Sequence, residues 1–412
     1  MATLDGVQLF DPSGRPTSGG AFLLNGAAKA SLSDTGTDGW NVEVKVGCNY
    51  IAAWAPKTTS GYDECREAAF KAAHQGLDLF SISRSADLGI RDSETEHITW
   101  WPEATGQVLR VTNVVTLSVA MEAKGVVTDA VGNIVPPLPR PPAAWHESLR
   151  YFRLAQITDD LFDAYRNLYL ALESILDHIA PQAVNASGKP SENESAWFIR
   201  ALGVADTRVA LAPFAPKEAT NPIQDLFNEL YVSARTALFH AKGSRPSFLP
   251  HAPGKDKEVI AAAVKRLSSL FIALAEKELG TRSVMGAVTY AGFDRMTDGL
   301  KSLLRLQATD DTAGARPDIE VLNPTGGAVI DLNTRHAPEL DKPLIRSFLG
   351  TANAQEISKL SRLAVVAAKV DDKLIAHGSI DGELILGGVE RLEGQVAIRM
   401  QNAQQPKAYF AT

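Results

Sequence analysis

The sequence is poor in cysteine, lacks long apolar runs and has no excess of positive charge, and each shortage excludes a class of protein. Two cysteines in 412 residues, Cys48 and Cys65, are too few for a disulfide framework or a four-cysteine zinc site. No stretch approaches the roughly 18 consecutive apolar residues of a membrane helix. The N-terminal residues also lack the basic and apolar regions of a secretory signal. We therefore expect a cytoplasmic protein with no membrane partner.

The net charge of −7 at pH 7 shows that the chain as a whole is not a polycation suited to nucleic acid. Any such role must come from a local basic patch. No spacing of histidine, cysteine and carboxylate side chains suggests a metal site, and no glycine-rich loop stands between a strand and a helix. We accordingly expect neither a metal nor a cofactor.

The chain is long enough for more than one hydrophobic core, and its composition is that of an ordinary globular protein. With 412 residues, two or three domains are expected. The segment "PPLPRPP", residues 136–142, holds five prolines, which fix the backbone and predict a stiff linker. We therefore predict an N-terminal domain over 1–135, a linker over 136–144, a central domain over 145–280 and a C-terminal domain over 281–412.

The N-terminal segment predicts an α+β domain. Alternation in "WNVEVKV" places Val42, Val44 and Val46 on one face of a strand, and "VLRVTNVVTLSVAME" alternates in the same way. Between them, "YDECREAAFKAAHQGLDLF" has the alanine content and spacing of a helix, and Gly76 follows its last periodic residues.

The C-terminal segment predicts a β-rich domain. In "KLIAHGSIDGELILGG", Asp381-Gly382 lies between two apolar runs, which is typical of a hairpin turn. The stretches "GQVAIRMQ" and "KAYFAT" are typical of short strands, whereas "LDKPLIRSFLG" and "DGLKSLLRL" are typical of short helices.

The central segment predicts a bundle of four or five helices. In "TDDLFDAYRNLYLALESILDHIAP", apolar residues recur at three- and four-residue steps. A further helix is expected from Asn221-Pro222 to Gly243, and another from about Asp256 to Gly280. The predicted fold class is thus multidomain α+β, with a central all-α bundle flanked by an N-terminal α+β domain and a C-terminal β-rich domain.

One motif in this segment has the residue types of a site that binds an anion and transfers a proton. In "ARTALFHAKG", Arg235 and His240 are separated by four residues near the end of a predicted helix. On a regular α-helix they lie roughly 140° apart around the axis and border the buried stripe. From Arg235 to Arg266, seven Lys and Arg stand against two acidic residues, a local balance of +5. Such a patch suits a polyanion, and a histidine within it can move a proton near neutral pH.

These blocks resemble the HEPN superfamily, in particular its ApeA-like and MauJ-like branches. "DLFDAYRNLYLALESILDHI" resembles the opening helix of the family, and "ELYVSARTALFHAKG" resembles its Arg-x(4–6)-His signature. The resemblance covers about 145–280. It implies a HEPN-like bundle that forms a homodimer and acts as a metal-independent endoribonuclease, in some members as a toxin or an antiviral defence effector.

The resemblance also implies a role for each site residue. His240 would be the general base that removes the ribose 2′-hydroxyl proton, and Arg235 would stabilise the phosphate. Thr236 would complete the catalytic set, at a position where active members usually have Asn or Asp. Lys242 and Arg245 would bind flanking phosphates of the RNA.

Three other interpretations remain open from the sequence. His240 would be a helix C-terminal residue stabilised by the helix dipole. The chain would be a non-catalytic binding or dimerisation protein, such as a MauJ-like accessory protein of methylamine metabolism. It would also suit a sensor whose outer domains bind a phage component or a small-molecule trigger. Thr236 and the acidic overall charge favour the last two, whereas the basic run favours the nuclease.

Overall fold

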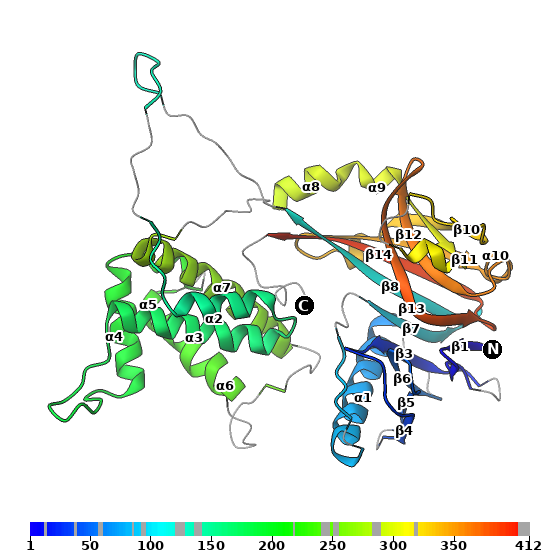
Figure 1. Cartoon of the computed structure of the whole chain (residues 1–412), viewed down its shortest axis with the longest axis horizontal. Coiled ribbons are helices and arrows are strands. Elements are labelled where there is room, and N and C mark those ends of the chain that lie inside the picture. The colour runs from blue at the N-terminus through cyan, green and yellow to red at the C-terminus, as the bar shows by residue number, and fades with distance from the viewer. Residues whose placement is uncertain are drawn as a thin grey trace. The chain divides into compact units, whose positions relative to one another are not determined.

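The computed structural model of the chain divides into two compact units (Figure 1). The first, here called the sheet unit, comprises Met1–Leu117 and Val288–Met400, and the second, the helical unit, comprises Ser118–Ala287 and Gln401–Thr412. The structure describes the chain apart from residues 12–14, 37–38, 57–60, 85, 92–95, 120–127, 136–141, 217–218, 240–247, 250–254, 282–289, 317–319 and 403–412. The predicted linker, except residues 142–144, and the predicted strand "KAYFAT" therefore lie outside the described residues.

The predicted fold class is wrong, because both ends of the chain build one sheet instead of two separate domains around a central bundle. The sheet has 14 strands. In order from edge to edge they are β2 (Val7–Gln8), β1 (Ala2–Leu4), β13 (Lys373–Leu386), β12 (Leu363–Val370), β9 (Leu304–Thr309), β10 (Val329–His336), β11 (Ile345–Asn353), β14 (Arg391–Asn402), β8 (Gly106–Val119), β7 (Glu96–Glu103), β3 (Ser18–Leu23), β6 (Tyr50–Ala55), β5 (Asn41–Val44) and β4 (Leu32–Thr35). Even the first strand of the chain, β1, pairs with β13 near the other end. Alternation along a strand shows which face is buried and not which strand it pairs with, so this arrangement had no local signal.

The N-terminal and C-terminal strands meet where β8 lies beside β14. Three side-chain hydrogen bonds join Arg110 to Glu393, Thr112 to Gln395 and Thr116 to Arg399. All three pairs are 283 positions apart in sequence. A constant offset means that the two strands run parallel, since the offset would change along an antiparallel pair. The other described registers in the sheet are antiparallel, so the sheet is mixed.

The sheet curls around an apolar core. Buried residues of β1, such as Leu4, belong to the same cluster as Tyr50 and Ala52 of β6, although nine strands lie between β1 and β6 in the sheet order. At the rim of this core, the Asn49 side chain donates to Asp381 at 3.0 Å. Only a strongly curved sheet brings strands so far apart in its order to one core.

Helix α1 (Tyr62–Ser83) packs on the opposite face of the same strands. Along β3, Ala21 and Leu23 point into the enclosed core, while Phe22 belongs to the cluster that α1 covers. The helix was predicted, but Gly76 lies inside it and does not end it. A Cβ atom at Gly76 would come within 2.6 Å of Val42 Cγ1, so this glycine allows α1 to approach β5 closely.

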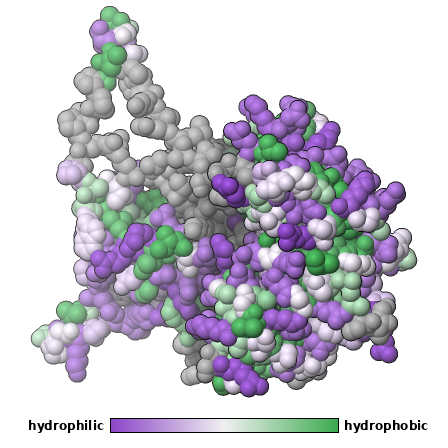
Figure 2. All heavy atoms as spheres, turned by 45° about the vertical axis from the view of Figure 1, so that its right-hand side comes forward, coloured by the Kyte–Doolittle hydropathy of each residue, from purple (hydrophilic) through white to green (hydrophobic). Residues whose placement is uncertain are grey.

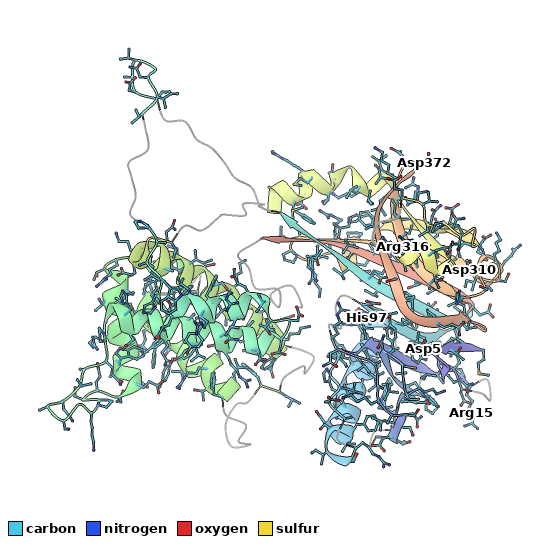
Figure 3. All side chains as sticks on the ribbon, in the orientation of Figure 1. Asp5, Arg15, His97, Asp310, Arg316 and Asp372 are labelled. Carbon is cyan, nitrogen blue, oxygen red and sulfur yellow. The ribbon has the colours of Figure 1, made fainter. Side chains whose placement is uncertain are left out.

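The predicted hairpin at Asp381-Gly382 is also wrong, because β13 runs without a turn through both residues. The pairing of β13 with β12 shifts register near this point, as at a β-bulge. The Asp5 carboxylate accepts the Glu383 N–H at 2.7 Å, and a Cβ atom at Gly382 would lie 2.5 Å from the Asp5 carboxylate (Asp5 is labelled in Figure 3). Gly382 thus allows β13 to lie close to Asp5, and it does not form a turn.

The predicted helix at "LDKPLIRSFLG" is a strand instead. Residues 345–350 begin β11, all six are buried, and β11 pairs with β10 and β14 on its two sides. A strand buried on both faces shows no alternation, which explains the misassignment. Short helices of this unit are α8 (Tyr290–Asp298), α9 (Leu300–Leu303), α10 (Ala354–Ile357) and the 3-10 helices Thr312–Ala315 and Pro338–Leu340.

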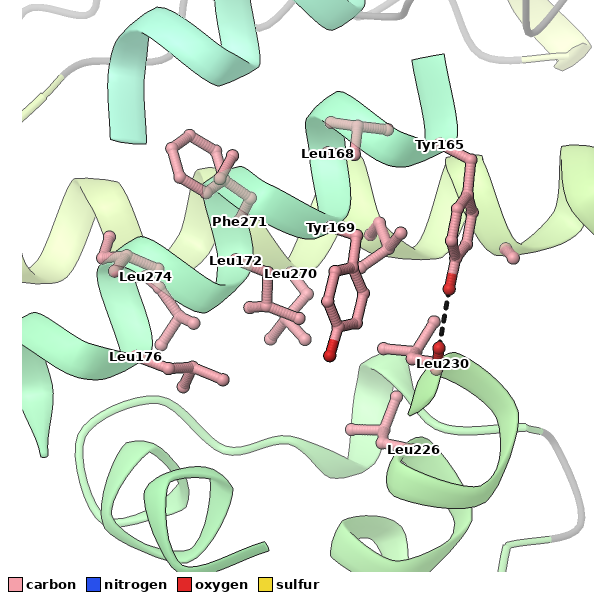
Figure 4. Packing of buried hydrophobic residues seen from close by; sticks show 14 of the residues in the cluster. Tyr165, Leu168, Tyr169, Leu172, Leu176, Leu226, Leu230, Leu270, Phe271 and Leu274 are labelled. Atoms are coloured by element: carbon pink, nitrogen blue, oxygen red, sulfur yellow. Dashed lines mark hydrogen bonds between the residues drawn. The ribbon is translucent and has the colours of Figure 1, made fainter. Parts of the chain in front are cut away.

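The helical unit contains α2 (Ser148–Ile157), α3 (Leu161–Ile179), α4 (Glu194–Asp206), α5 (Pro222–Leu226), α6 (Thr236–Phe239) and α7 (Lys255–Leu279), with a 3-10 helix Ala212–Phe214 and a π-helix Phe227–Arg235. These helices share one apolar core (Figure 4). The helix predicted for α3 is confirmed, and its apolar stripe is buried. The helix predicted from Asn221-Pro222 is confirmed as far as Phe239, where α5, the π-helix and α6 follow one another without a break, and its predicted end at Gly243 lies outside the described residues.

The described surface is mixed in polarity. On the face drawn in Figure 2, hydrophobic side chains occur in small groups among hydrophilic ones. Within the described part of the chain, no helix combines the length and the apolar character needed to cross a membrane.

Candidate functional site

Arg235 is the last residue of the π-helix, a conformation that no sequence pattern indicates. The hydroxyl of Tyr165, on α3, donates to the Leu230 carbonyl within the π-helix at 2.6 Å (Figure 4). Thr236 Oγ1 donates to the Tyr231 carbonyl at 3.3 Å. A π-helix is rare and is often found at functional positions, because its wider turns redirect the side chains that follow. Here α3 fixes the π-helix and with it the position of Arg235.

The Arg235 guanidinium is held in one orientation. Its Nη2 forms an ion pair of 2.7 Å with Glu194, the first residue of α4. Its central carbon lies 4.6 Å from the ring centre of Tyr231, 5.5 Å from that of Tyr169 and 5.9 Å from that of Phe239. One quarter of the Arg235 side chain remains exposed. A guanidinium carries several donors in a rigid fork, so an arginine oriented in this way is suited to bind a planar or tetrahedral anion.

A second carboxyl group, that of Glu173 on α3, is close enough to interact with both Arg235 and Glu194. We call these three residues, together with Tyr169, the Arg235 cluster. Burial and the neighbouring negative charge of Glu194 raise the pKa of Glu173, while Arg235 acts in the opposite direction. A neighbouring carboxylate disfavours ionisation, so Glu173 takes up a proton more readily than an ordinary glutamate. The cluster therefore has acid–base character near its single guanidinium.

Tyr169 contributes a buried hydroxyl without a hydrogen-bond partner in the structure. The side chain is 2% exposed, and its ring stacks on Phe198 with a centroid distance of 5.9 Å. Burial raises the pKa of Tyr169 well above its usual range, so the hydroxyl remains a donor. Figure 4 shows the contrast with Tyr165, one turn earlier, whose hydroxyl is bonded. A buried polar group left unsatisfied calls for an explanation, and a ligand is one.

The structure places only part of the predicted site. Arg235 and Thr236 are described, and Thr236 is half-buried with its hydroxyl bonded to the backbone. His240, Lys242 and Arg245 lie outside the described residues. The structure thus neither brings them to Arg235 nor separates them from it.

No sequence pattern points to the three residues that surround Arg235, which are Glu194, Tyr169 and Glu173. Glu194 reads as a helix-start residue, Tyr169 as core and Glu173 as a surface position of α3. They are 41, 66 and 62 positions from Arg235, and no local pattern connects them with it. Only packing of α3 and α4 against the π-helix brings them together.

The basic stretch from Arg235 to Arg266 has less unpaired positive charge in the fold than its sequence suggests. Two of its cations are paired with acids that lie outside it: Arg235 with Glu194, and Arg266 with Glu229. Counting charges along the chain ignores partners that other helices supply. The described part of this stretch is therefore less positive than its composition suggested.

Comparisons of the chain with models of protein families, with curated proteins and with solved structures found no match. Over the described residues, no three His, Cys, Asp or Glu side chains are grouped so that they could hold a metal ion.

Proposed function

We propose that the chain binds RNA at the Arg235 cluster and cleaves it without a metal, the activity that the HEPN resemblance implies. One observation supports this most: Arg235 is held by Glu194 and three aromatic rings while part of its side chain stays exposed. An arginine fixed before its ligand arrives needs little rearrangement to stabilise the charge of a reacting phosphate.

In the proposed reaction, His240 removes the proton of a ribose 2′-hydroxyl. The 2′-oxygen then attacks the adjacent phosphorus, the bond from phosphorus to the 5′-oxygen breaks, and the departing oxygen takes up a proton. Arg235 stabilises the negative charge on the phosphate oxygens. The products are a 2′,3′-cyclic phosphate and a free 5′-hydroxyl, with Lys242 and Arg245 on flanking phosphates.

The neighbouring acids are compatible with an anionic ligand when one of them is protonated. The raised pKa of Glu173, due to its burial and to Glu194, reduces the negative charge beside Arg235. The Tyr169 hydroxyl adds a donor to the same cluster. The two cysteines are free and buried, which suits the reducing cytoplasm that we propose as the location.

A second candidate function is a non-catalytic assembly or sensor protein. It is favoured by the same ion pair, because Glu194 already neutralises Arg235 and a phosphate must compete with it. In that case the cluster is a structural part of the helical unit or of a homodimer interface.

The test uses the full-length protein with end-labelled single-stranded RNA in EDTA. We expect cleavage to products with cyclic phosphate ends, and a loss of at least 100-fold in Arg235→Ala and His240→Ala, on the order of the contribution of one general base. Arg208→Ala is the matched control, since Arg208 pairs with Glu278 in the same unit and contacts none of the cluster residues in the described structure. Cleavage retained in His240→Ala contradicts the proposal. Absence of cleavage, together with a dimer that dissociates in Arg235→Ala, supports the assembly function instead.

A further inference from the structure

Phe239, the last residue of α6, is an exposed aromatic residue beside the Arg235 cluster. Ala237 and Leu238 of the same helix are buried, whereas Phe239 is 46% exposed. Successive residues of a helix point about 100° apart, so the turn that buries Leu238 directs Phe239 to the edge of the core. The exposure of Phe239 therefore follows from its place on the helix and not from loose packing.

The ring of Phe239 lies near three side chains of the helical unit. Its centre is 5.9 Å from the guanidinium carbon of Arg235 and 5.8 Å from that of Arg166, on α3. The ring centre of the buried Tyr169 is 6.4 Å away. A guanidinium about 6 Å from a ring centre is attracted to the ring, so Phe239 and the two arginines form one connected surface. We call Phe239, Arg166 and Arg235 the Phe239 surface.

The charges of the Phe239 surface are balanced by neighbouring acids. Arg235 forms an ion pair of 2.7 Å with Glu194, and Arg166 forms one of 3.1 Å with Asp163. Net charge therefore selects no ligand here, and the uncovered part of the ring is the feature that remains. The pair of Arg166 joins two exposed side chains, and because such pairs contribute little to stability, Arg166 can turn to a ligand.

The side chains of the Phe239 surface limit what can lie on it. A cation would meet two guanidinium groups of its own sign, and an alkyl chain would find one ring among charged side chains. A planar aromatic group, in contrast, stacks both on an aromatic ring and on a guanidinium plane. In RNA that group is an unpaired base, and Arg235 beside the ring would bind the adjacent phosphate in the proposed function.

We propose that Phe239 and Arg166 form a stacking subsite for one unpaired base of a single-stranded RNA, next to the phosphate at Arg235. The subsite, which rests on the proposed function, adds to it the conformation of the substrate: a nucleotide whose base is free to leave its neighbours. Bases within a duplex are paired and stacked on one another, so they are not available to Phe239. Stacking on an aromatic ring tolerates any sequence, because every base has a π-face.

The test measures binding of two fluorescent octamers to the full-length protein by anisotropy. Both are abasic sugar-phosphate strands without 2′-hydroxyls, so they cannot be cleaved, and one of them carries a single 2′-fluoroguanosine at its centre. We expect this base to tighten binding roughly fivefold to 100-fold, the range for one base stacked on an aromatic ring. Phe239→Leu should abolish this gain, whereas Phe239→Tyr, which keeps a ring, should retain it.

The matched control is Val232→Ala, which removes an apolar side chain of similar exposure, 49%, from the preceding π-helix and should leave the gain unchanged. Phe239 is exposed, so its variants are expected to fold, and unchanged thermal unfolding verifies this. A gain that depends on Phe239, in a protein that leaves RNA uncut in EDTA, upholds the subsite and refutes the nuclease.

Three results overturn the stacking subsite. The first is equal binding of the two octamers, or binding of neither, by the wild-type protein, or a gain that persists in Phe239→Leu; cleavage of RNA would still uphold the proposed function. The second is guanosine monophosphate that competes as tightly as the guanine octamer, since the ligand would then be a free nucleotide. The third is a wild-type dimer in sedimentation that Phe239→Leu dissociates, since a second copy of the chain would then cover the ring.

Discussion

Tyr165 and Tyr169 lie one turn apart on α3 and are both buried, but their hydroxyls differ in hydrogen bonding. The Tyr165 hydroxyl donates to the Leu230 carbonyl at 2.6 Å, whereas the Tyr169 hydroxyl has no hydrogen-bond partner among the residues that the structure describes. Replacing each with phenylalanine removes one oxygen and keeps the ring, so the pair is its own control. We expect Tyr165→Phe to lower the free energy of unfolding, and Tyr169→Phe to leave it level or raise it.

The magnitudes follow from the hydrogen bonds. Tyr165→Phe leaves a buried carbonyl of the π-helix without this donor, which costs about 1–3 kcal/mol. Tyr169→Phe removes a buried hydroxyl that is unsatisfied, so its desolvation cost disappears and stability rises by up to about 1 kcal/mol. The difference between the variants is therefore roughly 1–4 kcal/mol, which an unfolding curve resolves.

Urea unfolding followed by circular dichroism at a helical wavelength measures this, since the helical unit dominates that signal. Midpoints should shift down in Tyr165→Phe and stay level or shift up in Tyr169→Phe, with equal slopes. If Tyr169→Phe destabilises as much as Tyr165→Phe, the Tyr169 hydroxyl has a partner and the reasoning is refuted. If that hydroxyl serves a ligand, Tyr169→Phe should also lower RNA cleavage while it gains stability, as expected for a group kept for function.

Two further predictions concern charged groups in the two units. The folded pKa of Glu173 lies above its ordinary value of 4.5, so its contribution to stability is complete below pH 4.5 and is lost as the pH rises through the raised folded value. Glu173→Gln should therefore raise the urea midpoint at pH 7 and leave it unchanged at pH 4, and an equal effect at both pH values would contradict the shift. In the sheet unit, Arg110→Met leaves the buried Glu393 with only its contact to Arg391, which should cost about 3 kcal/mol. Calorimetry should show that the double variant Arg110→Met with Glu393→Leu recovers most of this loss, whereas a double variant as unstable as the single one would refute the pairing.

The sequence alone predicted those helices and strands whose apolar periodicity depends only on neighbouring residues. The stripe of α3 repeats every three or four residues, so periodicity predicted a helix whose buried face is the observed one. In the same way, alternation predicted β8 and the alanine-rich spacing predicted α1. These predictions hold because each pattern depends only on residues a few positions away in the sequence.

Local patterns failed where a distant segment determined the conformation. Asp381-Gly382 has the composition of a turn, but Asp5 occupies the space that the missing side chain leaves, and the strand continues. The stretch at β11 was assigned to a helix because strands on both sides bury it and remove the alternation. Both outcomes depend on contacts that cross most of the chain.

At the candidate site, the sequence by itself determined that Arg235 lies in a helical segment at the start of a locally basic stretch. Tertiary structure decided its surroundings: the π-helix held by Tyr165, the ion pair with Glu194 and the carboxyl of Glu173. The same holds for the fold class, since the pairing of β8 with β14 joins residues 283 positions apart. Periodicity specifies which face of an element is buried, whereas the partner that buries it is selected by packing and hydrogen bonding among all elements at once.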